Sequence, residues 1–227
     1  TTAAHNTAVG TECMKVSTTG HSNVGMGSQA LIALTTGDSN VAIGYAALNN
    51  VTSADDNTAL GRSALQENST GTRNTAVGYA ASLLATGNDN TTVGFSSGSA
   101  ITSGISNTFV GALAGDATDD GTSNTAVGKG ALSANCADNN TAVGASAGLV
   151  VTGSSNTLLG EAAGVAVTSG SNNCILGANA GRTGGPGGNI TTASNILSLG
   201  DGSIATANIQ VDWTVASDAR DKTDFTA

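Results

Sequence analysis

The five-residue sequence NTAVG occurs at residues 6–10 and returns unchanged at 74–78, 124–128 and 140–144. It belongs to a longer pattern in which an Asn is followed four residues later by a Gly, with Asn at 6, 23, 40, 57, 74, 90, 107, 124, 140, 156 and 173. Successive Asn residues are 16 or 17 residues apart, which gives eleven copies with almost no drift. Eleven domains cannot have so short a period, so each copy must be one rung of an extended, stacked object.

The positions of a rung are numbered here from its Asn, which is position 1. Position 2 is usually Thr, position 3 is mostly Ala, position 4 is always aliphatic or Met, and position 5 is always Gly. Position 8 is always small, being Ala, Ser or Cys. The four NTAVG copies contribute the clearest structural repeat residues, namely Asn6, Gly10, Asn74, Gly78, Asn124, Gly128, Asn140 and Gly144.

Positions 2 to 4 have the composition of a short strand, because Thr, Val and Ile favour strands. Side chains alternate between the two faces of a strand, so positions 2 and 4 share one face and position 3 takes the other. All three positions are apolar or small. We therefore expect both faces to be covered, which indicates a partner chain or a second wall.

The other constant positions of the repeat fit turns, at positions 1 and 5, and a crowded interior, at the small position 8. The Gly column fits a turn that needs positive φ or a close approach of backbone, and the Asn column fits a turn-forming side chain that bonds nearby backbone. A helical array is disfavoured, since each Gly in a helix interior costs about 1 kcal/mol. The sequence thus predicts an all-β, β-solenoid or β-helix-like fold of eleven 16–17-residue rungs.

The pattern divides the chain into four parts. The predicted repetitive shaft spans 6–181, and a Gly/Pro-rich hinge spans 182–194, where the only Pro of the chain lies. Residues 195–216 form a predicted terminal β segment that carries the only Trp, Trp213, a candidate plug for the end of the core. The charged residues 217–227 differ in character from everything before them.

Composition excludes several classes of function. The net charge is −9 with only 7 Lys and Arg, so no basic patch is available for nucleic acid. No run of 18 apolar residues exists, so we expect no membrane insertion. The three cysteines, Cys13, Cys136 and Cys174, are odd in number and scattered in the repeat, which favours free thiols over disulfides or zinc ligands. No cofactor is expected.

Catalytic and metal sites are also disfavoured. The adjacent acids Asp55/Asp56 and Asp119/Asp120 lie in polar loops, where solvated turns are a commoner explanation than the paired carboxylates of a glycosidase. Aromatics are 3% of the chain, which leaves little to stack sugars. His5 and His21 fit a surface pair better than a ligand set, and the Thr column lacks the strict Thr-x-Thr array that would suggest ice binding.

The segment ASDARDKTDF, residues 216–225, resembles the opening of the intramolecular chaperone domain that follows many phage tail fibres and tailspikes of the endosialidase type. Those domains begin Ser-Asp-x-Arg-x-Lys-x-Asp and then an apolar residue, and all of these positions match here, from Ser217 through Lys222 to Phe225. The resemblance implies a self-cleaving pair, Ser217 and Lys222, with the cut between Ser217 and Asp218. Only ten residues follow Ser217, so the chaperone body is absent and only a longer precursor would cleave itself.

The repeats likewise look like the shafts that precede such domains. The resemblance implies a homotrimeric phage tail fibre in the virion, whose partners are its own copies, other tail proteins and a host receptor, and which is no enzyme. The loops 52–56 and 118–121 are candidate attachment surfaces. The alternative is a bacterial surface adhesin or extracellular filament built from the same coil, because trimeric adhesin heads use similar repeats of shorter period.

Overall fold

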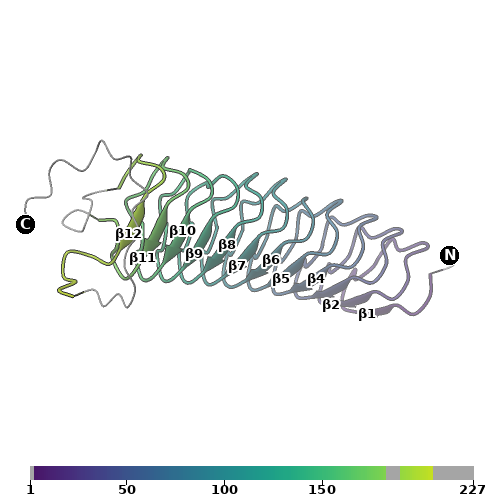
Figure 1. Ribbon diagram of the computed structural model, residues 1–227. Coiled ribbons are helices and arrows are strands. Elements are labelled where there is room, and N and C mark those ends of the chain that lie inside the picture. Colours follow the sequence, from purple (N-terminus) through teal and green to yellow (C-terminus); the bar gives the residue numbers. More distant parts are fainter. Residues whose placement is uncertain (1–2, 183–189, 207–227) are drawn as a thin grey trace, which may run out of the picture.

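The computed structural model describes residues 3–182 and 190–206, and within these ranges it contains strands and turns but no helix. Twelve three-residue strands form one parallel sheet in sequence order. They are β1 (Thr7–Val9), β2 (Val24–Met26), β3 (Val41–Ile43), β4 (Thr58–Leu60), β5 (Thr75–Val77), β6 (Thr91–Val93), β7 (Thr108–Val110), β8 (Thr125–Val127), β9 (Thr141–Val143), β10 (Thr157–Leu159), β11 (Cys174–Leu176) and β12 (Leu197–Leu199). Figure 1 shows these strands stacked along one side of an elongated coil, with β1 and β12 at opposite ends.

Each strand consists of positions 2 to 4 of its rung, and each pairs with the next strand in the same register. The predicted all-β solenoid is therefore confirmed, with one strand per rung. The sheet has one strand more than the eleven predicted rungs. β12 lies in the predicted terminal β segment 195–216, and Ile196, not Asn195, takes position 1 of its rung, since Leu197 pairs with Cys174.

The strand faces are divided as the alternation predicted. Position 3 points into the coil and is buried in every strand from β2 to β12, whereas positions 2 and 4 point outward and are half-buried or exposed. Position 8 is fully buried from Ala30 to Ala180, which confirms the crowded interior expected for the small column. The coil thus covers one face of its sheet, and a single chain leaves the other face open.

Inside the coil, several rungs combine one large and one small side chain at positions 3 and 9. Ala42, Ala59 and Ala126 at position 3 accompany the buried Leu48, Leu65 and Leu132 at position 9. Phe109 at position 3 accompanies Gly115, and a Cβ placed there would lie 2.3 Å from the Phe109 ring. In the rung with Ala142 both positions are small, and a Cβ on its Gly148 would lie 2.6 Å from Leu158 of the next rung, so volume is also compensated between rungs, as a close-packed interior requires.

The Gly column has both properties that the sequence predicted. From Gly10 to Gly160 these glycines have φ between +130° and +141°, a region that side chains rarely adopt. A Cβ on Gly78 would also lie 2.3 Å from the carbonyl oxygen of Gly94 in the next rung. Both the turn and the close stacking of rungs therefore require Gly at this position.

Three further positions of each rung have positive φ although most of their residues are not Gly. They are the residue before the Asn, position 7 and position 9, for example Ser22, Gln29 and Leu31 at φ 57°, 62° and 52°. Each such residue costs on the order of 1 kcal/mol. The backbone amides of these residues donate to carbonyls of a neighbouring rung, as Leu31 does to Ala47 at 3.1 Å, and this stacking stabilises the turns.

The pairing of Phe109 with Gly115 can be tested by exchanging the large and the small side chain between these two positions. Gly115→Leu should lower the free energy of unfolding by more than the ~1–3 kcal/mol of ordinary overpacking, because the Phe109 ring occupies the space. Phe109→Ala alone should cost about 3–5 kcal/mol by opening a cavity. The double variant recreates the Ala/Leu pair of other rungs, so urea unfolding should show it to be more stable than either single variant; a purely additive loss would contradict the pairing.

The Gly column gives a second prediction. Gly78→Ala should destabilise the chain strongly, because it combines disfavoured φ with a clash against the backbone of the next rung. Gly130→Ala is the matched control, since Gly130 has φ +65° but its Cβ would meet nothing closer than 3.8 Å. The control should cost about 1 kcal/mol. Equal thermal unfolding midpoints for the two variants would show that contact with the next rung is not a reason why position 5 must be Gly.

Candidate functional site: the axial ladders and the outward strand face

The Asn residues of position 1 form a continuous internal ladder. Their side chains are buried from Asn23 to Asn173. In each rung the Oδ1 atom accepts a hydrogen bond from the backbone amide of position 1 in the next rung, as Asn57 does from Asn74 at 3.0 Å. The ladder runs unbroken from Asn6 to Ile196, whose amide donates to Asn173 Oδ1 at 3.0 Å.

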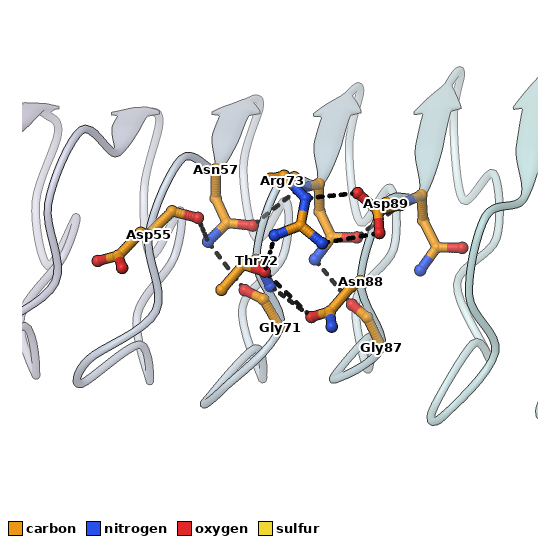
Figure 2. Close-up of polar contacts among 10 residues, drawn as sticks. Asp55, Asn57, Gly71, Thr72, Arg73, Gly87, Asn88 and Asp89 are labelled. Atoms are coloured by element: carbon orange, nitrogen blue, oxygen red, sulfur yellow. Dashed lines mark hydrogen bonds and ion pairs between the residues drawn. The ribbon is translucent and has the colours of Figure 1, made fainter.

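The other half of each Asn amide bonds the returning turn. Asn57 Nδ2 donates to the carbonyl of Gly71 at 2.9 Å and to that of Asp55 at 3.1 Å, as Figure 2 shows. Equivalent bonds reach the carbonyl three residues before position 1 of the next rung throughout the stack, except at Asn124, whose Nδ2 has no partner among the described residues. Each Asn thus satisfies backbone groups that the coil has removed from water.

The open face of the sheet is a regular surface of two columns. Position 2 is Thr in eight strands and otherwise Val, Cys or Leu, while position 4 is Val, Ile, Leu or Met. Several position 4 side chains are about half exposed, among them Val9 at 53%, Leu60 at 45% and Leu159 at 51%. None of the 24 outward positions carries a charge, on a chain with 16 acidic residues. An uncharged aliphatic stripe of this length is typical of an interaction surface.

The two pairs of adjacent acids lie in polar turns, where one member of each pair accepts a hydrogen bond from a neighbouring rung. Asp55 Oδ1 accepts the backbone amide of Asp38 at 2.8 Å, and Asp119 accepts from the hydroxyl of Thr102. Asp56 and Asp120 are exposed. His5 and His21 are exposed, and His21 Nδ1 accepts the backbone amide of Ala4 at 3.2 Å. The described residues contain no group of three or more His, Cys, Asp or Glu side chains placed to hold a metal ion.

The three cysteines are free thiols in the described structure. Cys136 is buried, and its Sγ lies 3.3 Å from the hydroxyl of Thr118. Burial raises the pKa values of the Cys13 and Cys136 thiols, which keeps both protonated near neutral pH. Cys174 differs in standing on the outward face, at position 2 of β11. Ser217, Lys222 and Trp213 lie outside the described residues, as do residues 183–189 of the predicted hinge.

One ion pair links adjacent rungs on the turn side. Arg73 Nε and Nη2 donate to the two carboxylate oxygens of Asp89 at 2.7 and 2.9 Å (Figure 2). The hydrogen bond and charge of Arg73 lower the pKa of Asp89. The pair therefore favours folding above the ordinary Asp pKa and loses this effect as the pH falls through the lowered pKa, and its full exposure keeps the contribution small.

No protein-family model, curated protein or solved structure matches the chain. No helix among the described residues could cross a membrane.

The Asn ladder generates a prediction with an internal control. Asn57→Ala should lower the free energy of unfolding by about 2 kcal/mol, because the buried Asn74 amide would lose its only partner, whereas the Gly71 carbonyl would keep its bond from Asn68 Nδ2. Asn50→Ala removes the same side chain from an exposed site, where it bonds only the Glu67 carboxylate. Urea titration should show almost no loss for Asn50→Ala, and similar losses for both would contradict the ladder.

Proposed function

We propose that the chain is the structural shaft of a homotrimeric phage tail fibre. The observation that carries the proposal is the uniform stack: one rung design repeated along one axis, with the same hydrogen-bonded ladder inside nearly every rung. Twelve strands at about 4.8 Å give a rod of about 50 Å along the sheet. Such a repeat supplies reach and stiffness, and it presents loops along its length.

The homotrimer is supported by the outward strand face. A strip about 50 Å long and three residues, about 10 Å, wide has a flat area on the order of 500 Å². That is of the same order as the ~800 Å² that each partner contributes to a stable interface. Three copies around a common axis would remove the three uncharged faces from water and leave the charged turns outside. The similarity of residues 216–225 to the start of a chaperone domain supports the phage assignment.

The proposal also assigns roles to the turns between strands and to the C-terminal residues Ser217 and Lys222. Host attachment is assigned to the turns, such as 52–56 and 118–121, where Thr52, Asp56, Asp119 and Asp120 are exposed. Ser217 and Lys222 would act in a longer precursor, where cleavage after Ser217 would release the chaperone. The second candidate function, a bacterial adhesin or extracellular filament, rests on the same rod and the same face, and the surrounding gene would distinguish it.

The oligomer can be tested by placing charge on the outward face. In the homotrimer, Val127→Asp with Leu159→Asp would bury carboxylates between copies, so light scattering should show the mass falling from three chains to one. The matched control is Ser123→Asp with Ser155→Asp, which puts the same charges on the exposed turns of the same two rungs. The control should retain the wild-type mass, and circular dichroism should show all three proteins folded. A folded monomeric wild type would refute the homotrimer.

A further inference from the structure

A ladder of aromatic and guanidinium groups lies on four successive rungs at position 6, just after the Gly column. It consists of Tyr45, Arg62, Tyr79 and Phe95, and all four side chains are exposed. The Arg62 Cζ atom lies 5.5 Å from the centroid of the Tyr45 ring and 5.8 Å from that of Tyr79. The Tyr79 and Phe95 rings are stacked at 5.4 Å with only 10° between their planes. We call this group the position 6 ladder.

The stacking determines which parts of the rings a ligand can reach. Tyr79 has Arg62 over one face and Phe95 over the other, so neither face is free. The solvent-facing parts of this ring are therefore its edge and its hydroxyl. A sugar stacks on ring faces, and the ladder is poorly arranged for that. The edge of an aromatic ring carries the positive end of its quadrupole, so the ladder favours a negatively charged ligand.

Arg62 supplies the charge for such a ligand. Its guanidinium makes no hydrogen bond and no ion pair with any described residue, and neither tyrosine hydroxyl does. The contrast with Arg73, whose guanidinium is neutralised by Asp89, shows that the chain has acids available for pairing. Arg62 is held between two rings instead, which restricts its side chain before a ligand binds. A guanidinium fixed in this way is suited to a planar carboxylate, which it can bind through two parallel hydrogen bonds.

The surroundings of the ladder favour a protein as the partner. The exposed rings of Tyr45, Tyr79 and Phe95 supply apolar surface around Arg62. Tyr and Arg are the residues that most often dominate the binding energy of protein interfaces, usually with apolar contacts around them. Elsewhere position 6 is small or charged, with Ser28, Ala112 and Glu161 as examples, so the clustering is confined to four rungs.

We propose that the position 6 ladder binds an acidic segment of a partner protein. A carboxylate of that segment is bound by Arg62, assisted by the hydroxyls of Tyr45 and Tyr79, while apolar side chains beside it pack on the ring edges. The partner is a protein other than a copy of this chain, and the site does not depend on the shaft role. A binding partner at this place would attach to the side of the rod rather than to its end.

The first measurement follows the Nε–H signals of the four arginines by ¹⁵N NMR during titration with sodium acetate at constant ionic strength. Arg73 is the internal control, because Asp89 already occupies it. We expect a saturable shift at Arg62 and almost none at Arg73. Equal shifts at both would show only general ionic effects and would overturn the site.

The second measurement uses poly-L-glutamate as the acidic chain and polygalacturonate as an acidic polysaccharide, both by calorimetry. Arg62→Lys and Tyr79→Leu should each weaken poly-L-glutamate binding by about tenfold, as expected for residues that dominate an interface. Arg73→Lys should leave it unchanged. No binding of poly-L-glutamate, or tighter binding of polygalacturonate, would overturn a protein partner.

Light scattering on the same variants separates this site from the oligomer. Arg62→Lys and Tyr79→Leu should leave the mass of the wild-type particle unchanged, whatever that mass is. A loss of mass in either variant would identify the ladder as a contact between copies and would overturn the proposal. A monomeric wild type that still binds poly-L-glutamate through Arg62 would refute the homotrimer and leave the site intact.

Discussion

The buried amide of position 1 is the interaction on which the rest of the coil depends. A coil with one short strand per rung turns its backbone back into the interior within a few residues, and the peptide groups there have lost water. An Asn side chain carries both an acceptor and donors, so one residue can satisfy the amide of the next Asn and the carbonyl of the returning turn. An Ala could do neither. Both bonds also form at Asn173, although position 1 of the next rung, Ile196, follows 23 residues later, so the ladder is kept across a longer connection.

Once the ladder fixes the spacing, the interior can vary as long as large and small side chains compensate within a rung or between neighbouring rungs. Phe109 beside Gly115 and Leu158 beside Gly164 fill the same space as Ala42 beside Leu48, since positions 3 and 9 face each other within a rung. Leu132 shows that position 9 accepts a side chain at φ 48°, so Gly115 is required for space and not for φ. The Gly of position 5 is different, because its φ near +136° and its contact with the next rung exclude every side chain. Two columns of glycine in one repeat therefore have two separate physical causes.

Much of this architecture could be predicted from the sequence, because a strict period exposes columns that a single copy would hide. The strand, the alternation of its faces, the Gly turn and the small interior column all follow from residue types averaged over eleven copies. The period could not reveal that Ser22, Gln29 and Leu31 adopt positive φ, since nothing in their chemistry requires it and the stacked hydrogen bonds impose it. The position 6 ladder was also missed, although Tyr45, Tyr79 and Phe95 share one offset from Asn. This shared offset is present in the sequence, but position 6 varies between rungs, and only the coordinates place Arg62 between two rings.

The distribution of charge gives the strongest physical link between this fold and assembly. Solubility of a chain with net charge −9 needs its acids at the surface, and the rod has surface on every side. None of the twelve acids among the described residues lies at the 24 outward strand positions, and all twelve lie outside the strands. Pleating alone does not require this, because positions 2 and 4 point to solvent in a single chain and would accept Glu or Lys without strain. We propose that this face, free of charge along twelve rungs, is covered by contact with another molecule along the rod, as in the homotrimer proposed above.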